Sequence, residues 1–150
     1  MRKQTEEARL AATRELAAQY QEAIKTITHD AAFAMIWLKG VRDYDALPTV
    51  DRMRLAMYFQ HISRIMEQQY LHTRHGHVDP AFFESIDLAY GEFLTFPGAQ
   101  RWWELSKDHF CADFRARVDA MLSAAKQRGY RSSFKERNAT DSDASAVAPG

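Results

Sequence analysis

Three histidines stand close together in the segment LHTRHGH, and imidazole nitrogens are common ligands of zinc. His72 and His75 share one face if this segment is helical, and His77 follows them closely. A zinc site needs three or four converging ligands, and no cysteine or carboxylate stands at a recognised spacing, although Glu67 and Asp79 are near in sequence. We therefore expect a solvated helix end without a metal or another cofactor, and keep His72, His75 and His77 as weak candidate ligands.

Two further pairs of residues could support catalysis. Cys111 follows His109, and a thiol becomes a nucleophile when a neighbouring group lowers its pKa. His61 and Glu67 fall on one predicted helix, but their spacing places the two side chains on different faces. Since neither pair has a partner that would complete a reaction centre, we predict no catalytic residues, and the sequence leans against an enzyme.

Arg101, Trp102 and Trp103 form the most pointed feature of the sequence. Neighbouring side chains lie about 100° apart on a helix, so we expect one indole in the core and the other in a groove. A groove indole offers apolar area and one N–H donor. We expect Arg101 to hold two helices in register through a buried ion pair with Glu67 or Asp87.

Tyr70 and Tyr90 lie on apolar stripes of predicted helices, and a buried hydroxyl needs a hydrogen-bond partner. We expect both to join Arg101 and Glu67 in an internal polar network. The residues predicted to form a ligand pocket or a partner groove are Arg101, Trp102, Trp103, Tyr70, Tyr90 and Glu67.

Helices are expected to carry these residues, because apolar residues recur at helical spacing and no segment alternates as a strand does. The predicted helices cover about residues 4–28, 31–40, 49–73, 80–95, 98–107 and 112–128. Asp30 and Thr49 are the expected N-caps of the second and third, and Gly76 suits the end of the third. Asp79 followed by Pro80 is a start signal for the fourth.

The predicted fold is all-α, a bundle of five or six helices in one domain over residues 1–130. Residues 1–11 are mostly charged and lack an apolar stripe, so we expect them to project from the bundle as part of a long first helix. Residues 131–150 are rich in Ser, Asp, Ala, Asn and Thr, which predicts a disordered tail.

Composition excludes several classes of function. The 150 residues carry 20 Lys and Arg against 20 Asp and Glu, so a nucleic-acid partner, which requires a basic surplus, is not expected. The single cysteine, Cys111, cannot form an internal disulfide and suits a reducing compartment. The longest apolar run, residues 31–38, is much shorter than the roughly 20 residues of a membrane-spanning helix.

The order of several motifs resembles an uncharacterised family of small bacterial proteins that have an N-terminal transmembrane anchor followed by a helical domain. The matching residues are Thr28-His29-Asp30, Ala34, Trp37-Leu38, Gly40, Leu47-Pro48-Thr49, Arg54, Arg64, Glu67, Tyr70, Gly76, Asp79, Phe83, Pro97-Gly98, Arg101-Trp102-Trp103, Phe110, Phe114-Arg115 and Val118-Asp119. The chain departs from the pattern in two places: the anchor is missing, and Cys111-Ala112 replaces the usual Ser-Pro.

The resemblance implies a cytoplasmic domain at the inner face of a bacterial membrane, attached only through an anchor that this chain lacks. Arg2 and Lys3 would be the remnant of the basic exit from that anchor. Our first hypothesis is therefore a non-enzymatic interaction or scaffold domain that binds a protein partner or self-associates through its first helix. The alternative is a small-ligand sensor with an inter-helix pocket lined by aromatic residues and Arg101. A histidine-based metal enzyme or hydrolase is the third hypothesis.

Overall fold

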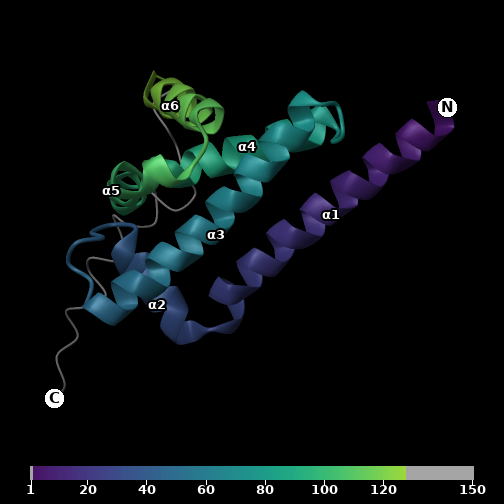
Figure 1. Ribbon diagram of the computed structural model, residues 1–150. Helices are drawn as coiled ribbons and strands as arrows, with labels where there is room; N and C mark the ends of the chain where they lie inside the picture. The colour runs from purple at the N-terminus through teal and green to yellow at the C-terminus, as the bar shows by residue number, and fades with distance from the viewer. Residues whose placement is uncertain (1, 128–150) are drawn as a thin grey trace, which may run out of the picture.

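The computed structural model describes residues 2–127, with side chains from Thr5 onward, and every regular element in this range is helical (Figure 1). The elements are α1 (Arg2–His29), α2 (Ala31–Gly40), α3 (Thr49–Arg74), α4 (Pro80–Leu94), α5 (Pro97–Ser106), the 3-10 turn η1 (Lys107–His109) and α6 (Ala112–Gln127). The predicted all-α fold with a long first helix is confirmed. The predicted tail lies outside the described residues.

Helix α3 is the central element of the bundle. Helix α1 lies along one side of α3 and runs in the opposite direction, while α4 returns along another side (Figure 1). Helix α2 contacts both α1 and α3, and α5 and α6 pack against α4. Among the described residues, no helix is both long enough and apolar enough to cross a bilayer.

Local sequence signals explain most helix ends. The carboxylate of Asp30 accepts a hydrogen bond from the Phe33 backbone N–H (2.9 Å), and Asp79 caps α4 in the same way, as predicted. Gly76 adopts a φ of 74° after α3, which confirms it as the terminating residue. The prediction for Thr49 is wrong, because Pro48 occupies the N-cap position and no side chain caps α3.

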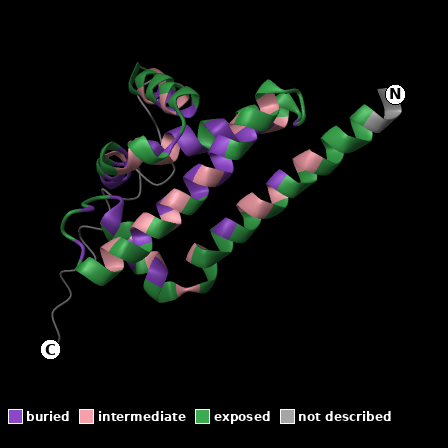
Figure 2. Cartoon of the chain, viewed as in Figure 1, coloured by how far each residue is buried: buried purple, intermediate pink, exposed green. Residues whose placement is uncertain are grey.

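The core is dominated by aromatic side chains between α3, α4, α5 and α6. Phe59 on α3 meets the Trp102 ring edge to face, with centroids 5.5 Å apart, and Phe110 and Phe114 pack against Trp103. Only two side chains of α1 are buried in the described range, and its residues 5–11 are all exposed (Figure 2).

The end of α2 and the start of α5 meet backbone to backbone. The Gly98 N–H donates to the carbonyl of Val41 (2.8 Å), and a Cβ on Gly98 would lie only 1.7 Å from the Gly40 carbonyl oxygen. No side chain fits at Gly98 without separating the two helices. This contact fixes the position of α5, which carries the tryptophan pair.

Candidate functional site

Both indoles of the tryptophan pair lie in the core. Trp102 is 1% exposed and Trp103 is 0% exposed, so the prediction that one of them lines a groove is wrong. The physical reason is that α5 is enclosed on two sides: Trp102 points to Phe59 of α3 while Trp103 points to Phe114 of α6. The indole N–H of Trp103 has no hydrogen-bond partner among the described residues, which fits a packing role.

Arg101 lies at the surface. Its guanidinium pairs with Asp45 in the loop between α2 and α3 (Nε to Oδ2, 2.7 Å), and about half of each side chain is exposed. The predicted buried ion pair of Arg101 with Glu67 or Asp87 is therefore wrong. Trp102 and Trp103 occupy the inward positions of α5, so Arg101 lies on the face of the helix that points away from the core.

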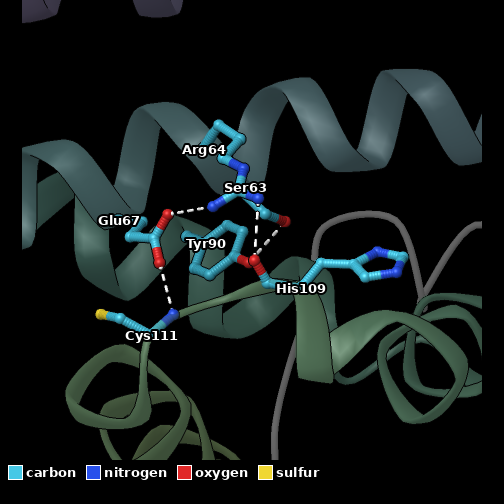
Figure 3. Close-up of polar contacts among 6 residues, drawn as sticks. All are labelled: Ser63, Arg64, Glu67, Tyr90, His109 and Cys111. Carbon is cyan, nitrogen blue, oxygen red and sulfur yellow. Dashed lines mark hydrogen bonds and ion pairs between the residues drawn. The ribbon is translucent and has the colours of Figure 1, made fainter.

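Glu67 does form a polar network, but with other partners (Figure 3). Its two carboxylate oxygens accept hydrogen bonds from Arg64 (2.6 Å) and from the backbone N–H of Cys111 (2.7 Å). Arg64 also donates to the carbonyl of His109 (2.8 Å) and covers the ring of Phe110. The network joins α3 to the start of α6, which is an architectural role.

The charge state of Glu67 follows from these contacts. Burial acts to raise the pKa of Glu67, but the hydrogen bonds from Cys111 and Arg64 outweigh burial, and the pKa lies below the usual value. Asp87 behaves in the opposite way, because burial raises its pKa although Arg117 forms an ion pair with it. The folded protein therefore stabilises the ionised form of Glu67, whereas desolvation disfavours the ionised form of Asp87.

Neither tyrosine of the predicted site contacts Arg101, although both rings pack against Phe114. Tyr90 is buried and donates to the Ser63 hydroxyl (2.7 Å) (Figure 3). Tyr70 is half-buried and contacts the ring of Phe114 and the guanidinium of Arg74. Thus the six predicted site residues do not line a common pocket; they divide between the aromatic core, the Glu67 network and the surface.

The three histidines come together at the end of α3. The ring centroids are 5.9 Å apart for His72 and His77 and 6.0 Å apart for His75 and His77, and all three side chains are exposed. No group of three or more His, Cys, Asp or Glu side chains in the described part of the chain is placed to hold a metal ion. The cluster therefore has the geometry of a solvated helix end.

A pocket of about 550 Å³ lies on the other side of α3, between α1, α2 and α4. We call it the α1–α4 pocket. Its lining residues are Tyr20, Ile24, Ile27, Thr28, Ala34, Trp37, Leu38, Tyr58, Ile62, Ala89, Tyr90, Glu92, Phe93 and Phe96. Tyr90 is the one residue of the predicted site that reaches it.

Most of the pocket wall is apolar, and its polar groups are few. Tyr58 donates its hydroxyl to the carbonyl of Ala23 (3.3 Å), and burial raises the pKa of Tyr58 to about 12. Burial also raises the pKa of Tyr20, and the nearby carboxylate of Glu92 raises it further. Both phenols are therefore neutral at physiological pH, beside a single carboxylate.

Sequence periodicity predicted these residues as helix stripe and did not indicate a pocket. Tyr20 and Ile27 belong to the apolar stripe of α1, yet they are only half-buried, and Ile24 is 39% exposed. The only signal that the sequence offers is an apolar stripe rich in aromatic side chains. Neighbouring side chains do not fill all the space between such rings. Whether a space remains between these rings depends on how α1 packs against α3 and α4. That packing is a tertiary property.

Comparison with known proteins adds no functional assignment: no protein-family model, no curated protein and no solved structure matches the chain.

Proposed function

We propose that this protein is a non-enzymatic helical domain that binds a small, largely apolar ligand in the α1–α4 pocket. The observation that carries the proposal is the pocket itself. A volume of about 550 Å³ lies within the range of small-molecule sites, roughly 300–1,000 Å³, and an apolar wall with a few polar groups is typical of them. This replaces the site expected around Arg101 with one formed by Tyr20, Trp37, Tyr58 and Glu92.

The wall comes from four helices, which supports a sensing role. A ligand that contacts α1 and α4 together would bind one arrangement of the two helices more tightly than another, and so would shift their relative population. Few buried groups of α1 would oppose such a shift, since Leu16 and Ala23 are its only buried side chains in the described range.

The test uses nuclear magnetic resonance titration of the full chain with two aromatic probes of matched shape, uncharged tert-butylbenzene and cationic phenyltrimethylammonium. We expect at least one probe to shift the signals of Trp37 and Phe93. Ala34→Leu fills the pocket from α2 and should abolish these shifts. The matched control is Ala120→Leu, which adds the same side chain at an exposed position of α6 and should bind as the parent does.

Binding that survives Ala34→Leu, or the absence of binding by both probes to the parent chain, would contradict the proposal. Circular dichroism of both variants shows whether the fold is retained, so that loss of binding can be assigned to the pocket.

A second candidate is the interaction or scaffold role, and one observation favours it. Val50, Met53 and Met57 lie on one face of α3 and are about 60% exposed. Helical spacing turns them into a continuous apolar row, which is a feature of partner-binding surfaces. On this proposal the domain binds a protein partner at the inner face of a bacterial membrane, a location that rests on the family resemblance alone.

Affinity purification from membranes, with quantitative mass spectrometry, tests this second role. A partner that binds this row should be enriched with the parent chain and lost with Met53→Glu, while Glu84→Gln, at an exposed position of α4, should retain it. Identical protein sets from the parent and Met53→Glu, together with a monomer in light scattering, would count against the scaffold role and against self-association through α1.

A further inference from the structure

The α1–α4 pocket contains one charged residue, and it is an acid. Of the lining residues Glu92 is the only carboxylic acid, and none is Lys, Arg or His. Among the described residues Glu92 makes no ion pair; the eight ion pairs present there involve other carboxylates. A carboxylate at the edge of an apolar pocket can interact with water or with a ligand.

The rest of the wall provides aromatic rings. Six of the lining side chains are aromatic: Tyr20, Trp37, Tyr58, Tyr90, Phe93 and Phe96. Trp37 and Phe96 meet edge to face with centroids 6.1 Å apart, so their ring faces are not stacked on each other. The faces of aromatic rings are electrically negative, and cages of such rings recognise quaternary ammonium groups.

The electrostatic state of the two phenols adds to this field. Glu92, Tyr20 and Tyr58 all line the pocket; beyond the effect of burial, the Glu92 carboxylate raises the pKa of Tyr20, and Tyr20 raises the pKa of Tyr58. Since both phenols stay protonated, they contribute dipoles and ring faces without a second negative charge. The pocket therefore combines one acidic side chain, Glu92, with an otherwise largely apolar wall.

Three classes of ligand can be compared with this pattern. The head group of an anionic amphiphile would either be repelled by Glu92 or lie against an apolar wall, where no cation could pair with it. A neutral hydrocarbon would fit the volume but would desolvate Glu92 without compensation. A cationic head group would pair with Glu92 and lie over the rings, while an apolar body would fill the space between α1 and α2.

We infer that the ligand of the α1–α4 pocket is a cationic amphiphile, an amine or quaternary ammonium compound whose charge lies between Glu92 and the rings of Tyr20 and Tyr58. This inference rests on the proposed function, because it specifies the chemistry of the same pocket.

The test compares isosteric probes on the full chain. Phenyltrimethylammonium and tert-butylbenzene have the same shape and differ in charge, and benzenesulfonate provides an anion of similar size. We expect the cation to bind about tenfold more tightly than its neutral isostere. Glu92→Gln should remove most of that preference, because the cation loses its counter-charge and tert-butylbenzene no longer desolvates a carboxylate. Glu84→Gln, an exposed glutamate on the same helix that does not line the pocket, is the matched control and should retain the preference.

The possible outcomes separate the two proposals. If the neutral probe or the anion binds as tightly as the cation, the inference is overturned while the proposed pocket function stands. A preference that persists in Glu92→Gln also overturns the inference, because the charge is then recognised elsewhere. If no probe binds the parent chain, both proposals fail.

Discussion

Glu67 accepts hydrogen bonds from a neighbouring arginine on its own helix and from a backbone N–H at the start of α6. A charge-assisted bond to a backbone N–H is stronger than a neutral one, and this N–H would otherwise be one of the unpaired donors at a helix start. The carboxylate of Glu67 thus pairs a donor at the start of α6 although the two residues are far apart in the sequence.

Glu67→Gln should lower the free energy of unfolding by about 1–2 kcal/mol near neutral pH, because the amide keeps the volume but loses the charge-assisted bonds. Since the pKa of Glu67 is lowered in the folded state, its stabilising effect is present above the unfolded pKa and is lost as pH falls through the folded pKa. Urea unfolding of parent and variant, measured near pH 7 and again near pH 3.5, should therefore show a difference that shrinks in acid.

Asp87→Asn is the matched comparison. Burial raises the pKa of Asp87, so its ionised form is disfavoured in the folded state and the neutral amide should not reduce stability at neutral pH. Equal losses of stability in Glu67→Gln and Asp87→Asn would show that the hydrogen bonds of Glu67 do not outweigh its burial.

At the scale of elements, the contact between the end of α2 and the start of α5 depends on one missing side chain. Pro97 and Gly98 are the first two residues of α5. The structure shows in addition that the Gly98 N–H donates to Val41 and that its Cα faces the Gly40 carbonyl at close range. Backbone atoms cannot move aside as a flexible side chain can.

Gly98→Ala should therefore lower the free energy of unfolding by roughly 3 kcal/mol or more, as overpacking against backbone does. Gly91→Ala is the control, because a Cβ there would meet the Met121 side chain at an ordinary 3.6 Å and the helix would gain from alanine. Chemical unfolding of both variants checks the difference. A Gly98→Ala protein as stable as Gly91→Ala would contradict the close approach.

At the scale of the whole molecule, α1 consists of an exposed front and a rear that covers α3. Deletion of residues 2–9 should change the free energy of unfolding by less than about 0.5 kcal/mol, because the described side chains in this range are exposed. Leu16→Ala, which empties a fully buried position of the same helix, should cost about 3 kcal/mol. Urea unfolding of the two variants tests the division, and a deletion as damaging as Leu16→Ala would refute it.

The sequence predicted the elements well because their signals are local. Apolar periodicity depends on neighbouring residues, and the caps at Asp30 and Asp79 act within one turn, so helix positions could be derived without tertiary information. The N-cap prediction for Thr49 is wrong because Pro48 also suits the position before a helix. The residue types alone do not show which of the two is the N-cap.

The site was predicted poorly because it depends on how helices rest on one another. Arg101 could pair with any nearby carboxylate, and the partner became Asp45 only because α5 turns both tryptophans inward. The α1–α4 pocket is a space that the side chains of four helices leave unfilled, and an unfilled space has no signature in the spacing of one helix. Glu92 carried no motif that distinguished it from the other acids.

The arrangement of the three tryptophans has a practical consequence. Trp102 and Trp103 are enclosed by the core, whereas Trp37 is half-buried in the wall of the α1–α4 pocket. A dissolved collisional quencher such as acrylamide should reach one indole and not the other two, and a ligand in the pocket should shield it. The protein thus carries its own optical indicator of occupancy, readable from intrinsic fluorescence without any label.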